Sequence, residues 1–157
     1  MRKLLFTVSL LLIFSSTAMG GDSVEDNCKD TISFSTAEVF VDSNKDDLVA
    51  YQIGIRYDKN RIKIVGLEGG VDGFQKPPFY DRAGLEGGHI IIAAFVDDDI
   101  HAKKGNSKVA RIHLQTKGCP PFVLKPEPMA AAKPGGMSIP VKVKIDFNRR
   151  QGFHNGR

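Results

Sequence analysis

The residues with the clearest potential for chemistry are two groups of acidic side chains, and the first lies early in the chain. Asp42, Asn44 and Asp46 have the D-x-N-x-D spacing that opens a calcium-binding loop. The sixth position of such a loop requires Gly and the twelfth Glu, whereas this chain has Asp47 and Ile53. We therefore interpret the segment as a polar hairpin loop between two strands and not as a metal site.

The second acidic group, Asp97, Asp98 and Asp99, follows the apolar segment 89–96. Three adjacent carboxylates repel one another, so the charge is relieved either by a cation such as calcium or by water. We favour hydration, with calcium as the alternative, and predict no metal or cofactor. His101 beside this run makes the only cluster of a histidine with carboxylates, and the chain has no G-x-S-x-G motif. The sequence therefore predicts that the protein is not an enzyme.

The two cysteines, Cys28 and Cys119, are ninety-one positions apart. Neither has a second Cys or a His two to four residues away, which argues against a zinc site. An even number of cysteines in an exported chain favours a disulfide, with two free thiols as the alternative. A bridge between Cys28 and Cys119 would connect the first strand to a late one, and it would contribute about 4–5 kcal/mol in the chain-entropy model.

Apolar and polar residues alternate with a period of two along most of the chain, and no stretch has the periodicity of an amphipathic helix. The alternating segments are 37–42, 48–57, 61–67, 107–117 and 141–147, with 31–34 and 121–125 as weaker strand candidates. The positions that we expect to face inward are Ala37, Val39, Val41, Val49, Tyr51, Ile53, Ile55, Tyr57, Ile62, Ile64, Ala110, Ile112, Leu114, Val141, Val143, Ile145 and Phe147. This pattern predicts an all-β protein with two antiparallel sheets packed as a sandwich.

Four segments depart from the alternation. Residues 89–96 are apolar on both faces, as in a central strand covered on both sides or a strand that packs an outer loop. Residues 69–88 contain six glycines and two prolines, which predicts a long loop with a short helical turn near 81–85. The Pro- and Ala-rich segment 126–138 is predicted to be a second loop, and 148–157 a disordered basic tail.

The first twenty residues have the pattern of a secretory signal peptide. A positive start, Arg2 and Lys3, is followed by an apolar run over 4–14 and by the small-x-small sequence at 18–20. A membrane anchor is the alternative, but it needs about 20 apolar residues. We therefore expect 1–20 to be removed, and the protein to be secreted, extracellular or periplasmic, with no membrane span in the mature chain.

The positive charge of the chain lies mainly at its ends. The whole sequence has a net charge of +4, and two of its 22 basic residues lie in 1–20. The segment 141–157 is strongly basic, so the body of the protein between these ends is slightly acidic. Nucleic-acid binding needs a basic stripe across the folded body, often with aromatic residues for stacking, and none is visible. No nucleic-acid partner is predicted.

The run LVAYQIGIRYDKNRIKIVGLEGG at 48–70 resembles the signature of cohesin domains, in which a strand ending in Tyr-Asp is followed by a turn and a second strand ending at Gly. The matching residues are Tyr51, Gln52, Tyr57, Asp58, Ile62, Ile64, Val65, Gly66 and Gly69. The later segments 87–99 and 105–118 also resemble the second half of that family. The resemblance covers 31–147 and implies a nine-stranded jelly-roll β-sandwich, shared with carbohydrate-binding modules, within a domain at 28–147.

Five residues are candidates for a binding surface. Phe40 has outward parity, Phe79 and Tyr80 follow two prolines in the long loop as a rigid aromatic tip, and Gln52 and Arg56 point outward from one strand. The cohesin resemblance implies a non-catalytic recognition module that binds an extracellular protein of the dockerin type, in assemblies that degrade polysaccharide. A module that binds polysaccharide directly is the alternative, and the absence of Trp disfavours it.

Overall fold

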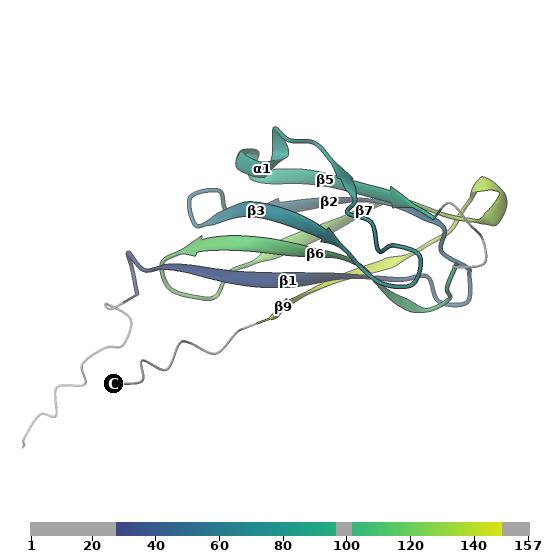
Figure 1. Cartoon of the computed structure of the whole chain (residues 1–157), viewed down its shortest axis with the longest axis horizontal. Coiled ribbons are helices and arrows are strands. Elements are labelled where there is room, and N and C mark those ends of the chain that lie inside the picture. Colours follow the sequence, from purple (N-terminus) through teal and green to yellow (C-terminus); the bar gives the residue numbers. More distant parts are fainter. Residues whose placement is uncertain (1–27, 97–101, 149–157) are drawn as a thin grey trace, which may run out of the picture.

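The computed structural model describes residues 28–96 and 102–148. Within these ranges the chain forms two antiparallel sheets stacked face to face, with the apolar core between them (Figure 1). The predicted signal peptide at 1–20, the acidic run with His101, and residues 149–157 of the tail predicted at 148–157 lie outside the described residues, whereas Asn148 is the last residue of a strand. The expectations for these segments stay predictions.

Nine strands make up the two sheets of the described chain. The four-stranded sheet has the order β3-β6-β1-β9, with the bounds Ile62–Gly69, Asn106–Lys117, Ile32–Asp42 and Lys142–Asn148. The five-stranded sheet has the order β4-β5-β2-β7-β8, with the bounds Phe79–Tyr80, His89–Phe95, Ala50–Tyr57, Leu124–Lys133 and Met137–Ser138. The prediction of an all-β, antiparallel two-sheet sandwich is confirmed.

The core forms where the inward residues of both sheets meet. In β1, Ala37, Val39 and Val41 are fully buried, and β2 contributes Ile53 and Ile55 from the opposite sheet. Each buried Val or Ile side chain stabilises the fold by roughly 1.5–3 kcal/mol relative to an exposed one. The predicted inward residues of β3 and β6 are also buried: Ile62, Ile64, Ala110, Ile112 and Leu114.

Some predicted inward positions are less buried than expected. Val49 is only half-buried, and Leu48 takes its place in the core. The reason is that β2 begins at Ala50, while Leu48 forms an isolated bridge in which its N–H donates to the carbonyl of Lys103 at 3.0 Å. The inward residues of the β9 segment pack against the core but stay half-buried, because β9 is an edge strand. These are Val141, Val143, Ile145 and Phe147.

The prediction of a loop at 126–138 is wrong, because most of this segment forms β7 and β8. Pro126 and Pro128 lie opposite Ile55 and Ile53 of β2. The short strand β8 pairs only with the far end of β7, so the prolines lie where β7 has a partner on one side only. Proline is tolerated in such a place because its missing N–H removes no ladder bond on the open edge.

The long segment 69–88 is less irregular than predicted. It contains the edge strand β4, which pairs with β5, and the single-turn helix α1 (Gly84–Gly87). The helical turn predicted near 81–85 is therefore present but displaced toward the C-terminus. The N–H of Ala83 donates to the Asp81 carboxylate at 3.0 Å and starts this turn.

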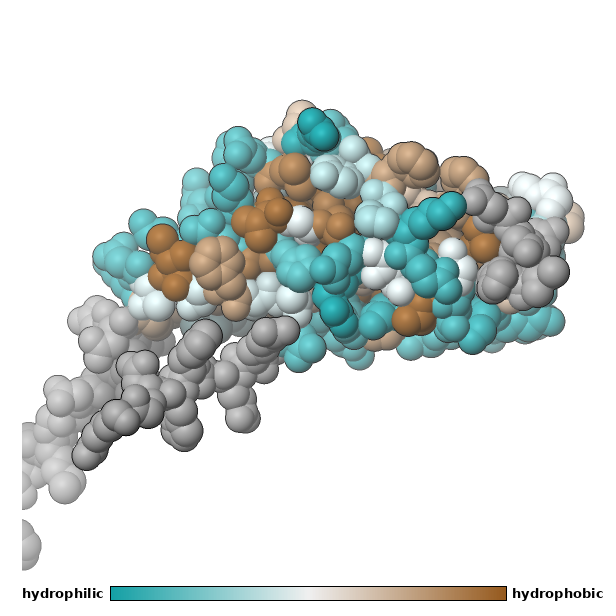
Figure 2. Space-filling model, in the orientation of Figure 1, coloured by the Kyte–Doolittle hydropathy of each residue, from teal (hydrophilic) through white to brown (hydrophobic). Residues whose placement is uncertain are grey.

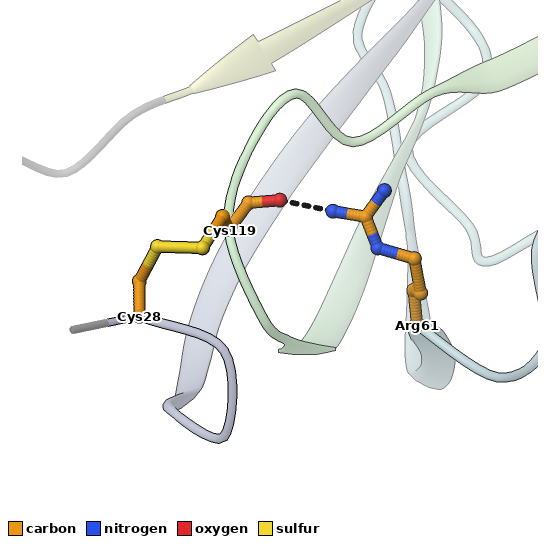
Figure 3. Close-up of a disulfide and its surroundings, with 3 residues drawn as sticks. All are labelled: Cys28, Arg61 and Cys119. Carbon is orange, nitrogen blue, oxygen red and sulfur yellow. Dashed lines mark hydrogen bonds between the residues drawn. A yellow bond between two sulfur atoms is a disulfide. The ribbon is translucent and has the colours of Figure 1, made fainter. Parts of the chain in front are cut away.

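The predicted disulfide between Cys28 and Cys119 is confirmed, with a Cα–Cα distance of 5.0 Å. Figure 3 shows the bridge beside Arg61, whose guanidinium donates a hydrogen bond to the carbonyl of Cys119. The strands β1 and β6 already pair with each other as far as Ile32 and Lys117. The bridge therefore closes the end of an existing ladder, and it ties the start of the described chain to this ladder.

Candidate binding surface

The central part of the outer face of the four-stranded sheet carries paired charges. Glu38 on β1 lies at the centre: its carboxylate accepts a hydrogen bond from Arg111 at 2.8 Å and lies 3.4 Å from the ammonium of Lys108. Arg111 is also 3.7 Å from Glu68, which lies 3.0 Å from His113. The Arg111 hydrogen bond lowers the pKa of Glu38, against the opposing effect of burial. Opposite charges on this face are thus satisfied by one another.

Phe40 also lies on this charged face. It is half-buried and lies opposite Lys108 on β6 and Lys144 on β9 in the two strand pairings. The outward parity predicted for Phe40 is correct, but the structure places it on a different sheet from the other candidate binding residues. Phe40 therefore does not contribute to the surface that they form.

The outer face of the five-stranded sheet is different, because it contains an apolar groove of about 390 Å³. We call it the alanine groove, because six of its lining residues are alanines. The groove crosses five of the molecule's strands or their ends, and its lining is Ala50, Tyr51, Gln52, Phe79, Ala93, Ala94, Phe95, Ala130, Ala131, Ala132, Gly136 and Ser138. In Figure 2, tan and brown residues lie along the upper border above the end of β5, whereas the lower border near β9 is mainly teal.

Two stacked aromatic rings form one wall of the alanine groove. The ring centroids of Phe79 and Phe95 are 6.2 Å apart and the planes differ by 9°. Phe79 is 70% exposed and Phe95 is 59% exposed. Phe79 belongs to β4 and lies opposite Ala93 of β5, so the predicted aromatic tip of a loop is wrong: the ring is fixed on a sheet edge. The neighbouring Tyr80 lies opposite the buried Ile92 and does not line the groove.

The strand β5 buries only one of its faces. Ile90 and Ile92 are fully buried, while Phe95 on the outer face is exposed and Ala93 is half-buried. Of the two predicted arrangements, the strand covered on both sides is therefore wrong, whereas β4 and α1 of the long segment 69–88 do contact β5. The apolar character of both faces marks an exposed apolar surface instead.

Gln52 and Arg56 both point outward from β2, as predicted, but they occupy different surroundings. Gln52 lies in the alanine groove, where its side-chain amide is 3.7 Å from the sulfur of Met129 on β7. Arg56 lies outside this groove and donates to Glu127 at 2.5 Å. His89 is 3.6 Å from the other oxygen of Glu127, so a polar cluster adjoins the apolar groove on the same face.

The two inward tyrosines of β2 have structural contacts. The hydroxyl of Tyr51 donates to the carbonyl of Val109 at 3.2 Å, and its ring contacts Phe74 edge-on at 5.3 Å. The hydroxyl of Tyr57 donates to the carbonyl of Gly84 at 2.7 Å. Burial raises the pKa of both hydroxyl groups, so they stay neutral and serve as hydrogen-bond donors that connect the two sheets and α1.

The segment with calcium-loop spacing connects the two sheets. β1 and β2 belong to different sheets, so the hairpin predicted between them is wrong. The Asp42 carboxylate accepts the N–H of Asn44 at 2.9 Å, and Asp46 is paired with Lys133 at 3.1 Å. Across residues 28–96 and 102–148, no group of three or more His, Cys, Asp or Glu side chains could hold a metal ion.

The sequence reasoning missed most of the groove. Phe95 and the alanines of its floor were not candidates, because small residues have no chemical signature of their own. Two signals were available: the apolar outer face of 89–96, and the run of alanines at 130–132. The second signal lies within 126–138, where the prolines favour a loop.

Comparison with known proteins supports the fold. No protein-family model and no curated protein matches the chain. The chain is similar to a solved crystal structure in which a single-substitution variant of CaDoc0917 is bound to CaCohA2 at pH 5.5, a cohesin–dockerin complex. The TM-score is 0.56 at 12% identity, and the match covers 69% of this chain and 82% of the other. The fold is thus a cohesin-like jelly-roll β-sandwich.

In the part of the chain that the structure describes, no helix has the length and apolar character needed to span a membrane.

Proposed function

We propose that this protein is a secreted, non-catalytic recognition module that binds another protein through the outer face of its five-stranded sheet. The observation that carries the proposal is the alanine groove with its wall of stacked phenylalanines. An exposed apolar groove beside two stacked aromatic rings is typical of an interaction site. Exposed aromatic side chains also match the central part of protein interfaces, where a few rings supply most of the binding energy.

The partner that we propose is a folded protein of the dockerin type. The alanine floor leaves room for the protruding side chains of a helix, as in the docking of an amphipathic helix into an apolar groove. The similar solved structure is a complex of a cohesin with a dockerin, which supports this class of partner. Gln52 at the groove supplies a polar group that would orient the partner.

A secreted location and the domain limits are part of the same proposal. The Cys28–Cys119 bridge requires an oxidising compartment to form and persist. The leader pattern at 1–20 fits export, and the sandwich between 28 and 147 would then be the mature domain, followed by a short basic tail. A role in assemblies that degrade polysaccharide follows from the dockerin-type partner.

Titration calorimetry with a panel of purified dockerin domains tests the proposal. We expect at least one to bind the purified chain. Ala93→Arg, which places a long side chain in the groove, should abolish that binding. The matched control Gln115→Arg puts the same side chain on the outer face of the four-stranded sheet and should leave binding unchanged. Absence of binding to every dockerin, together with binding to a neutral polysaccharide that Ala93→Arg removes, would favour the carbohydrate-binding alternative.

A further inference from the structure

A second surface lies at the end of the sandwich where β2 turns into β3. Three adjoining grooves meet there, with volumes of about 430, 310 and 120 Å³, and Arg61 lines all of them. This end is separate from the alanine groove, which has no lining residue in common with it. We call it the Arg61 end.

The lining of the Arg61 end is strongly basic. Among the residues that the structure describes, Asp58 is the single acidic residue that lines these grooves, against seven basic residues: Lys29, Arg56, Lys59, Arg61, Lys63, Lys117 and Lys125. Acidic neighbours pair with three of them: Glu127 with Arg56 at 2.5 Å, Glu86 with Lys63 at 3.4 Å and Asp30 with Lys117 at 3.5 Å. An excess of positive charge remains on a body that is slightly acidic between the chain's basic ends.

Arg61 is held in place at the centre of this surface. Its guanidinium donates to the carbonyl of Cys119 beside the disulfide and lies 5.1 Å from the centre of the Phe122 ring (Figure 3 shows the first contact). The backbone around it is also fixed, because its carbonyl accepts the N–H of Lys117 at 2.8 Å. A cation that is already ordered loses less conformational entropy when a ligand binds.

Apolar side chains lie next to these cations. Pro121, Phe122 and Val123 line the largest of the three grooves, and Val123 is 50% exposed. The surface therefore offers cations for an anion and a flat apolar strip for a ring that carries C–H groups. Sugar rings substituted with carboxylate or sulfate have both properties.

We propose that the Arg61 end binds an acidic polysaccharide. The ammonium and guanidinium groups would pair with its carboxylates or sulfates, and the rings would lie along Pro121 and Val123. An acidic peptide fits less well, because Pro126 and Pro128 deprive the adjoining edge of β7 of backbone donors for an extended chain. A nucleic acid fits less well too, because Phe122 is half-buried beneath Arg61 and offers no free ring for base stacking.

Affinity electrophoresis of the whole purified chain in gels containing polygalacturonate, alginate or heparin tests the proposal. We expect at least one of the three polymers to retard the chain, with the effect falling as salt rises. The triple variant Lys59→Glu, Lys117→Glu, Lys125→Glu should weaken this binding by about tenfold or more, because each reversal replaces attraction with repulsion. These lysines are surface residues, so the variant is expected to fold.

The matched control is Lys45→Glu, Lys104→Glu, Lys142→Glu, at the opposite end of the sandwich. It changes the net charge by the same amount, so unchanged binding would locate the site at the Arg61 end. Methyl-esterified polygalacturonate, which keeps the sugar backbone and loses the charge, should not bind. Retardation by none of the three polymers, equal loss in both triple variants, or equal binding of poly-glutamate or duplex DNA would overturn the proposal. Dockerin binding is measured in parallel and is expected to be unchanged in both variants.

Discussion

The outer faces of the two sheets differ in the side chains that they present to solvent. Each sheet uses alternate residues to cover the common core, which leaves the other residues of every strand facing outward. On the four-stranded sheet the outward residues around Glu38 and Arg111 are charged and pair with one another, while Phe34 and Val65 are exposed on the same face. On the five-stranded sheet many outward residues are small or aromatic and leave the alanine groove open beside Phe79 and Phe95, next to the polar cluster of Arg56, His89 and Glu127.

This difference teaches that the core pattern and the binding pattern are independent. Inward positions determine which residues are buried, and they look alike in β1 and β2. Outward positions determine whether the polar groups of a face already pair with one another, or whether the face presents apolar surface that a partner can cover. A face of paired charges gains little from covering, because its charges would lose water and have partners already. A face of alanine and phenylalanine gains about 25 cal/mol for each Å² of apolar surface covered.

The largest test of this comparison removes the aromatic wall of the groove. The double variant Phe79→Ala, Phe95→Ala should weaken binding of a dockerin-type partner by about 3 kcal/mol, on the order of a hundredfold in Kd, because exposed rings at the centre of an interface supply much of its energy. Stability should change little, since both rings are mostly exposed. Calorimetry and urea denaturation measure the two effects.

The control for this variant removes apolar groups of similar exposure from the other face. Phe34, which is 72% exposed, and Val65 lie on the outer face of the four-stranded sheet. The double variant Phe34→Ala, Val65→Ala should leave partner binding unchanged. Equal loss of affinity in the two variants would mean that the faces do not differ in function.

A smaller effect is expected when the charged face is disrupted. Glu38→Gln removes the negative charge that Arg111 and Lys108 share but keeps one carbonyl acceptor, and it should lower the free energy of unfolding by about 1 kcal/mol at neutral pH without affecting partner binding. The measurement is urea denaturation of both proteins. A weakened partner affinity in Glu38→Gln would show that the charged face takes part in recognition.

The same variant has a defined pH dependence. The Arg111 hydrogen bond lowers the pKa of Glu38 below its ordinary value of 4.5. A carboxyl group with a lowered pKa in the folded state stabilises the protein above its unfolded pKa, and this contribution is lost as the pH falls through the folded pKa. The stability difference between the native protein and Glu38→Gln should therefore be constant near pH 7 and shrink below about pH 4.5. A difference that grows on acidification would contradict this account.

The sequence predicted the fold well because burial acts through alternation, which is visible in one strand at a time. The inward sets of β1, β2, β3 and β6 were correct for this reason. The prediction failed at 126–138 because proline disfavours a strand only where an N–H is needed for a ladder bond. No such bond is needed at these prolines, because β8 covers only one end of β7. The prediction that Val49 faces the core failed because the preceding residue, Leu48, bonds to Lys103, which is distant in sequence.

The candidate surface was less predictable, because it is assembled from separate parts of the chain. Gln52 and Phe79 were chosen and do line the groove, while Phe40 has the same outward parity on the other sheet. Parity identifies an outward residue but not its sheet. The alanine floor becomes a feature only when β2, β5 and β7 are adjacent, and the basic character of the Arg61 end is invisible for the same reason.

The smallest expected effect comes from a substitution at Gly54, which tests whether the side chains beside the alanine groove can move to admit an added methyl group. A Cβ atom at Gly54 would lie 2.8 Å from the imidazole of His89 and 3.4 Å from the Glu127 carboxylate. Both contacts are with side-chain ends that can move, so Gly54→Ala should change the free energy of unfolding by less than about 0.5 kcal/mol while displacing His89.

Gly70→Ala is the control, because the same atom there would overlap the backbone carbonyl oxygen of Lys108 on β6. A backbone in a paired strand cannot yield, so this variant should lose about 2 kcal/mol or more. Urea denaturation compares the two variants. If Gly54→Ala were as destabilising as Gly70→Ala, the His89–Glu127 cluster would be a rigid structural element. This part of the five-stranded sheet would then have side chains fixed by pairing, as around Glu38 on the four-stranded sheet.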